Sequence, residues 1–169
     1  MLLLQINSVA DALNSSEWLF PIAECFHIIA FAWSIGMIAV VDYKLLGFGI
    51  QHSKPSEILR DTAPWTLLGL AVVLLSGPIL FLTDVGMYLR NPSFIFKMCA
   101  LAAAILFNYT IHRKVAQSDS SSQAVRVVTA VVSLALWISV VFGGVFIASF
   151  ATRSYAKVDL SGVYTGGQC

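Results

Sequence analysis

Long runs of apolar residues, separated by short polar stretches, set the pattern of this chain. Four of these runs hold about twenty or more mostly apolar residues. A helix of that length crosses a bilayer core of roughly 30 Å. The pattern therefore predicts four transmembrane helices over about residues 18–49, 64–84, 91–113 and 125–151.

The polar stretches predict what surrounds these helices. In residues 1–16 the apolar positions fall on one side, which is typical of an amphipathic helix on a membrane surface. Residues 53–61 and 117–123 read as loops, and the polar tail 152–169 is expected to be extended or poorly ordered outside the membrane. We predict an all-α membrane protein: a four-transmembrane-helix bundle over 17–151, with the surface segment 1–16 before it and the tail after it.

Composition agrees with this fold class. Of 169 residues, 58% are hydrophobic and only 11% are charged, whereas a soluble domain has about 25% charged residues. The formal net charge of +1 gives no reason to expect nucleic acid as a partner, so the lipid bilayer is the partner predicted first. Three cysteines without CxxC spacing indicate neither a disulfide framework nor a zinc site.

Basic residues predict the orientation. By the positive-inside rule, the side of the membrane with more Lys and Arg in its connections faces the cytoplasm. Arg90, Arg153 and Lys157 lie on one side, and residues 1–16 hold no basic residue. Both termini are therefore predicted outside the cytoplasm. The opposite, basic side carries Lys44, Lys54, Arg60, Arg113, Lys114 and Arg126.

Polar residues inside the predicted spans are the candidates for function, because ionisable groups in a membrane are costly and usually face a bundle interior or a cofactor. Glu24 and His27 are three residues apart, so they share one helix face. Helical spacing extends that face to Ser34 and Asp42. Similar polar or small stripes on the third and fourth predicted helices comprise Lys97, Ala100, Ala104, Asn108, Arg126, Ser133, Trp137 and Gly144.

Depth decides which of these groups can meet. At about 1.5 Å per residue, His27 and Lys97 both lie in the outer half of the membrane. His112 lies roughly 30 Å from Asn91 along its helix, near the opposite surface. His27 and His112 are therefore not expected to share one haem iron. For Asp42 and Asn108, in the inner half, hydrogen bonding between helices is favoured over proton relay.

Several motifs resemble an uncharacterised family of small bacterial four-helix membrane proteins. They are the E-x-x-H of the first helix with its D-Y-K-L-L-G exit, Y-L-R-N-P-S-F-I-F-K before the third helix, N-Y-T-I-H at its end, and S-L-A-L-W-I in the fourth. The resemblance covers about residues 17–151. It implies a multi-pass protein of the bacterial cytoplasmic (inner) membrane, for which the distribution of basic residues predicts both termini in the periplasm.

More distantly, the chain is similar to the copper-resistance D-type membrane domain and to the membrane protoporphyrinogen oxidase. In that oxidase a first-helix His and a third-helix Lys are tied to haem b and activity, and they correspond to His27 and Lys97 here. The oxidase has Pro-Arg where this chain has Val41-Asp42. The resemblance implies a tetrapyrrole site and does not extend to the oxidase reaction.

Two functions stay open at this point, and with them the question of whether the chain is an enzyme. The first is a haem-b-binding membrane protein in electron transfer or porphyrin redox chemistry, with His27 as the iron ligand and Lys97 and Glu24 completing the site. The second is a non-catalytic accessory or anchor subunit of a larger membrane complex. A metal held by Glu24 and His27, with Asp84 or Cys99 added, is a further alternative.

Overall fold

The computed structural model describes residues 15–48, 53–118 and 120–165, and for residue 148 and residues 150–165 it describes the backbone alone. The described chain is helical, with α2 at Leu19–Leu45, α3 at Pro55–Thr83 and the short α4 at Val85–Arg90. The π-helix η1 at Asn108–His112 joins α5 (Pro92–Phe107) to α6 (Arg113–Gln117), and α7 spans Gln123–Thr165. The predicted surface helix falls, up to residue 14, outside the described residues.

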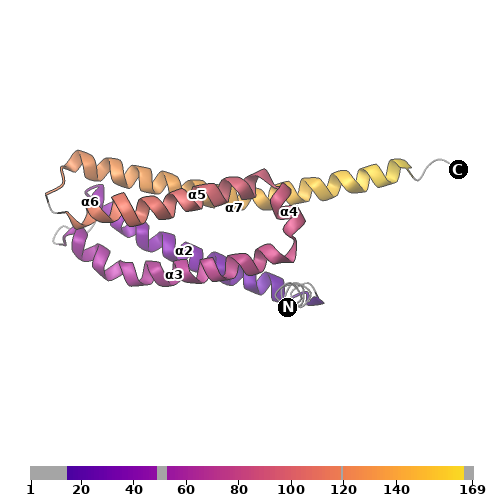
Figure 1. Ribbon diagram of the computed structural model, residues 1–169, viewed down its shortest axis with the longest axis horizontal. Helices are drawn as coiled ribbons and strands as arrows, with labels where there is room; N and C mark the ends of the chain where they lie inside the picture. The colour runs from indigo at the N-terminus through magenta and orange to yellow at the C-terminus, as the bar shows by residue number, and fades with distance from the viewer. Residues whose placement is uncertain (1–14, 49–52, 119, 166–169) are drawn as a thin grey trace.

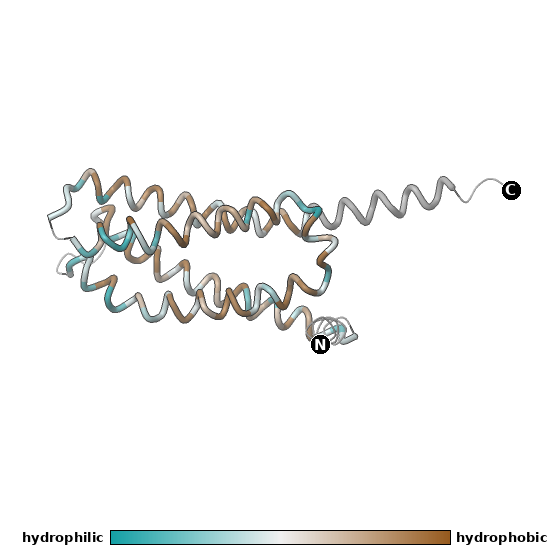
Figure 2. Tube along the Cα trace, in the orientation of Figure 1, coloured by the Kyte–Doolittle hydropathy of each residue, from teal (hydrophilic) through white to brown (hydrophobic). Residues whose placement is uncertain are grey.

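Four spans in the described part of the chain are long and apolar enough to cross a membrane: Leu19–Leu45, Pro55–Thr83, Pro92–Gln117 and Gln123–Ile147. They lie side by side as a bundle (Figure 1). Hydrophobic residues predominate along the spans (Figure 2), and many large apolar side chains, such as Leu75 and Leu106, are exposed on the outside. The fold therefore points to a multi-pass membrane protein, as the apolar pattern predicts.

Two predicted boundaries are wrong. Residues 55–61 were expected in a loop, but they form the first turns of α3. Pro55 occupies the first helical turn, and the Lys54 N–H donates to Glu57 Oε2 at 3.0 Å, so the start of the helix is capped by its own polar residues. The tail was expected to be extended or poorly ordered, yet α7 continues through Thr165.

The predicted start of the third span is confirmed. Asn91 is the N-cap residue of α5, its Oδ1 accepts from the Ser93 N–H at 3.0 Å, and Pro92 follows at the first helical position. The Asn91 side chain also donates through Nδ2 to the carbonyl of Ile147 at 3.2 Å. This buried residue thus fixes the start of α5 against α7.

The bundle is built from two close helix pairs, α2 with α3 and α5 with α7, and the pairs meet where α2 packs against α7. At the end that carries the six basic residues, here termed the basic end, α6 also contacts α3. A glycine sets the approach of the first pair, since a Cβ built on Gly69 would lie 2.9 Å from the Ala30 carbonyl oxygen and 3.0 Å from Ser34 Cβ. The buried core comprises Ile38, Leu70, Ala100, Leu101, Ala104, Trp137 and Val140.

Candidate functional site

The structure places the predicted site residues in two separate clusters, one at each end of the bundle. His27 and Asp42 both lie on α2, fifteen residues apart, which is about 22 Å along a helix. His27 is half-buried near the α4 end, and Asp42 is fully buried near the basic end. His112 joins Asp42 and not His27, so the expected separation of the two histidines is confirmed.

At the α4 end, His27 makes one well-defined hydrogen bond. Its Nδ1 lies 2.7 Å from Ser76 Oγ, and the Ser76 hydroxyl donates its hydrogen to the Val72 carbonyl oxygen at 2.6 Å. A hydroxyl has one hydrogen to give. His27 Nδ1 is therefore the donor to Ser76, and in the neutral imidazole Nε2 keeps its lone pair.

Glycines make room around His27 and Lys97. The His27 ring lies 3.5 Å from where a Gly77 Cβ would be, and Lys97 Cβ lies 2.9 Å from the corresponding position on Gly143. The Lys97 amine lies 5.9 Å from the centroid of the Phe31 ring and close enough to His27 to act on it electrostatically. Helices α2, α3, α5 and α7 thus all contribute to this cluster.

Glu24 is less enclosed than predicted. Its side chain is exposed, and within the described residues it forms no ion pair with Lys97 at 4.0 Å or closer. Its negative charge nevertheless acts on its surroundings: burial raises the pKa of the Tyr88 hydroxyl on α4, and the charges of Glu24 and Asp84 raise it further. Glu24 is therefore a nearby counter-charge and not a packed member of the cluster.

The described residues offer no set of ligands for the metal site that Glu24 and His27 were considered to form. Among the residues that the structure describes, no three His, Cys, Asp or Glu side chains gather where they could hold a metal ion. Asp84 accepts instead from the Met87 N–H at 2.9 Å and caps α4, and Cys99 is exposed.

Three aromatic side chains pack together at the α4 end of the bundle. Phe81 of α3, Tyr88 of α4 and Phe94 of α5 have ring centroids 5.2 to 5.9 Å apart. Contacts of this kind join helices through their large apolar area. The cluster connects α3 to α5 next to the His27 and Lys97 positions.

At the basic end, three helices meet in a buried polar network. Asp42 of α2 accepts through Oδ1 from His112 Nε2 at 2.7 Å and through Oδ2 from the Ser133 hydroxyl of α7 at 2.8 Å. All three side chains are at most 1% exposed. Both carboxylate oxygens are occupied, which is how buried carboxylates are stabilised. The expectation that Asp42 bonds helices together is confirmed.

The π-helix η1 presents His112 to this network. It comprises Asn108–His112 and ends at His112 itself. A π turn inserts one extra residue into an α-helix and so rotates the following side chains, which is why such turns are frequent at functional sites. The other imidazole nitrogen, His112 Nδ1, is buried and has no hydrogen-bond partner within the described part of the chain.

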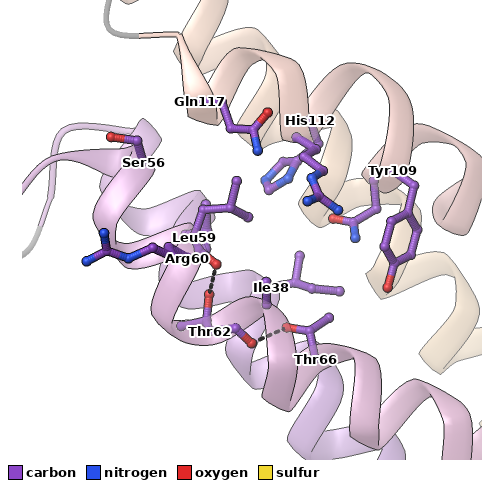
Figure 3. A pocket seen from close by; sticks show the side chains of 13 residues that line it. Ile38, Ser56, Leu59, Arg60, Thr62, Thr66, Tyr109, His112 and Gln117 are labelled. Carbon is purple, nitrogen blue, oxygen red and sulfur yellow. Dashed lines mark hydrogen bonds between the residues drawn. The ribbon is translucent and has the colours of Figure 1, made fainter.

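A cavity of about 90 Å³ lies between α3 and the η1 region, with His112 in its wall. Figure 3 shows His112 and Tyr109 on one side of this space and Thr62 and Thr66 of α3 on the other. Arg60 belongs to the rim, with its side chain 79% exposed and 3.6 Å from Asp61. The cavity therefore has a mostly apolar lining with polar side chains on two of its walls, and it reaches the basic end of the bundle.

Sequence reasoning named Asp42, Asn108 and His112 but did not combine Asp42 with His112 and Ser133. The signal was available, because Asp42 ends the first span and His112 ends the third, at the same depth. The partners lie 70 and 91 residues apart along the chain. Helical periodicity alone does not say which helices are neighbours.

The fold and these two clusters define a class: an all-helical bundle with four candidate membrane spans and ionisable residues in its interior. The chain belongs to the Family of unknown function (DUF6644), whose model matches residues 19–150. The predicted membership of an uncharacterised family is thereby confirmed. No curated protein and no solved structure matches the chain, so the distant likeness to copper-resistance domains and to the oxidase gains no support from relatives.

Proposed function

We propose that this protein binds haem b near the α4 end of the bundle and serves in electron transfer, with His27 as the residue that would hold the iron. The observation that carries the proposal is the hydrogen bond from His27 Nδ1 to Ser76. Histidines that ligate metals usually donate their other ring nitrogen to a nearby acceptor, which fixes the tautomer and the ring orientation. Here that arrangement leaves Nε2 as the nitrogen with the lone pair.

The surrounding residues fit the same group. Gly77 adjoins the imidazole without a side chain of its own, and Lys97 brings a positive charge to the same region. A cation so placed would pair with a haem propionate or act as a second ligand. Glu24 would balance the charge of Lys97. Haem b, when bound, supplies a one-electron iron couple whose potential depends on its ligands and on burial.

Electron transfer is preferred to porphyrin oxidation because of the position where the oxidase resemblance fails. Asp42 stands in place of the arginine of the oxidase, and it holds His112 and Ser133 inside the bundle. It therefore has a structural task at this position and does not offer a basic group to a substrate.

The test is an absorption spectrum of the protein purified in mild detergent from cells supplied with haem, recorded oxidised and after reduction with dithionite. We expect a Soret band and reducible α bands that are lost in His27→Ala. The control is His52→Ala, a histidine in the connection between α2 and α3, which should keep the bands. A flat visible spectrum from the folded wild-type protein would exclude the haem.

The hydrogen bond between His27 and Ser76 gives a second test of the haem proposal. Ser76→Ala removes the acceptor of His27 Nδ1 without touching the proposed ligand atom. Substitutions of this kind typically weaken a bound metal group about 10–100-fold, so Ser76→Ala should lose haem during dilution at concentrations that the wild-type protein withstands. Ser139→Ala on α7 is the matched control, because Ser139 bonds only its own helix, at the Ala135 carbonyl.

The second candidate function, an accessory or anchor subunit of a larger membrane complex, is favoured by one feature. Helix α7 continues through Thr165, beyond the span predicted to end near residue 151, and Figure 1 shows this part extending past the other helices. If it docks a partner, native gels of solubilised membranes should show a particle larger than the chain alone. Deleting residues 152–169 should then release the four-helix domain, whereas an unchanged particle would argue against this role.

We further propose that the chain lies in a bacterial cytoplasmic membrane with both termini in the periplasm. The proposal is supported by the six basic residues at the basic end, which the positive-inside rule assigns to the cytoplasm. Single cysteines placed at position 54 or 114 should be shielded from an impermeant maleimide in intact cells, after replacement of the native cysteines. Labelling at these positions would reverse the orientation.

A further inference from the structure

We propose that His112 and Asp42 form a proton-binding site, and that the proton reaches His112 Nδ1 from water in the adjacent cavity. The proposal concerns the basic end of the bundle and is independent of the proposed haem. It starts from an unsatisfied atom: His112 is 1% exposed, and its Nδ1 has no hydrogen-bond partner among the residues that the structure describes. Buried polar atoms are almost always hydrogen-bonded, to protein or to ordered water.

The cavity can hold the missing partner. Its volume is about 90 Å³, while one water needs roughly 10–15 Å³ by such a measure, so several waters fit. The lining offers oxygen lone pairs: Thr62 and Thr66 donate their own hydrogens to the carbonyls of Ile58 and Thr62 at 2.8 and 3.1 Å. Water molecules there would have acceptors on α3, and His112, whose Nδ1 is buried, lies in the opposite wall.

The hydrogen bonds of Asp42 determine which nitrogen of His112 is free to accept a proton. With Oδ2 accepting from Ser133 and Oδ1 facing Nε2, an ionised Asp42 holds the Nε2–H of His112. Nδ1 of the neutral ring then carries a lone pair. On protonation a hydronium in the cavity gives its proton to Nδ1, forming the N–H bond and leaving water, and the imidazolium charge is balanced by Asp42. Release reverses this step, and no electrons are transferred.

The charges around His112 come from every helix packed against it. Helix α2 contributes Asp42. Helix α3 contributes Arg60, which is exposed and close to Asp61. The η1–α6 segment contributes Tyr109 and Arg113 at the cavity. On α7, Ser133 is the residue near His112. The basic Arg126 lies seven residues earlier, and its guanidinium donates a hydrogen bond to the Ser118 carbonyl oxygen. Asp42 is therefore the single acidic group in contact with His112 among the described residues.

The proposal predicts a titrating imidazole with a defined tautomer. Protein labelled with ¹⁵N in its histidine rings is followed by NMR between pH 4 and 9, with the His112 signals assigned by their loss in His112→Gln. At high pH, Nε2 should be protonated and Nδ1 bare, and Nδ1 should take up a proton reversibly as the pH falls. A Nδ1 signal that stays unchanged over this range in the folded protein would overturn the proposal.

The carboxylate is tested by Asp42→Asn, which removes the charge but keeps a similar shape. Because an opposite charge in contact favours the charged form of its partner, folded Asp42→Asn should show less of the Nδ1-protonated ring than the wild type at the same pH. Ser133→Ala, which keeps the Asp42–His112 pair, should show as much of it as the wild type and remains informative if Asp42→Asn does not fold. An unchanged amount of the protonated ring in folded Asp42→Asn would refute the pairing.

The water path is tested by narrowing the cavity. Ala63 lines it on α3, and Ala63→Leu adds bulk there, whereas Ala102→Leu makes the same change at an exposed position of α5. The magnetisation-exchange peak between water and the His112 ring should be present in the wild type and in Ala102→Leu, and lost in Ala63→Leu. A peak that persists unchanged in Ala63→Leu would show that water does not reach Nδ1 through this cavity.

Discussion

The close approach of α2 and α3 at Gly69 leads to a prediction that can be worked from the structure. Gly69→Ala adds one Cβ, which would meet the Ala30 carbonyl oxygen at 2.9 Å and Ser34 Cβ and backbone nitrogen at 3.0 and 3.2 Å. None of these atoms is the far end of a flexible side chain. One helix must therefore move away from the other, which also stretches the 3.0 Å bond from the Ser34 hydroxyl to the Thr66 carbonyl.

Two effects of opposite sign act at Gly69. Adding a methyl group to a packed interface costs typically about 1–3 kcal/mol, whereas alanine favours a helix over glycine by about 0.8–1.0 kcal/mol. The net change expected for Gly69→Ala is thus about 0–2 kcal/mol of destabilisation. Gly36→Ala isolates the second effect, because Gly36 lies in α2 with nothing within 4 Å of its Cβ position.

The informative quantity is the difference between the two variants, since the helix preference is common to both and cancels. Gly69→Ala should have a free energy of unfolding about 1–3 kcal/mol below that of Gly36→Ala. Unfolding in mixed micelles by a denaturing detergent, followed by circular dichroism, measures both on the same scale. Equal stabilities within about 0.5 kcal/mol, the usual limit of additivity, would refute the close approach of α2 and α3 at this position.

Three shorter predictions follow from other contacts and use the same unfolding assay. Ser133→Ala removes one hydrogen bond to Asp42 and should cost about 0.6–1.7 kcal/mol, the range measured for bonds between membrane helices; no loss would mean that the bond is not formed. Asn91→Ala removes the α5 cap and the bond to Ile147 and should cost about 1–2 kcal/mol, whereas an unchanged stability would contradict both contacts. Gly143→Ala places a Cβ 2.9 Å from α5 and should fall below Gly36→Ala by about 1–3 kcal/mol; a value equal to Gly36→Ala would show that α5 yields there without cost.

The four spans could be predicted from the sequence because their signal is local. A run of about twenty apolar residues specifies a membrane helix whatever surrounds it. The helix ends could not be read in the same way. Residues 55–61 hold the polar Ser56, Glu57, Arg60 and Asp61, so the helix begins before the continuous apolar run does. The capping bond between Lys54 and Glu57 is the signal that marks the true start.

The two candidate sites could likewise be predicted from the sequence only in part. Depth along each helix placed His27 and Lys97 in one layer, and the structure brings them to one end of the bundle. The network of Asp42, His112 and Ser133 depends on which helices are neighbours and on the π turn before His112. The periodicity of a single segment predicts neither the neighbouring helices nor the π turn. The individual residues could therefore be recognised from the sequence, but their combination could not.

The two clusters share helix α2, and this limits how strongly they can influence each other. Fifteen residues of helix separate His27 from Asp42, about 22 Å. At that distance, and with an effective dielectric constant of about 20, one unit charge acts on another by about 0.75 kcal/mol. This corresponds to about half a pH unit.

If His27 holds a haem as proposed, the electron added on its reduction should therefore act on His112 by no more than about 0.75 kcal/mol, roughly a 3.5-fold change in the ratio of protonated to neutral ring. The measurement is the ¹⁵N spectrum of the His112 ring in oxidised and reduced protein, with His27→Ala as the control that removes the redox centre. A change of about a hundredfold in that ratio would exceed what charge alone provides over this distance. It would require the helices to move on reduction, with α2 as the element common to both ends.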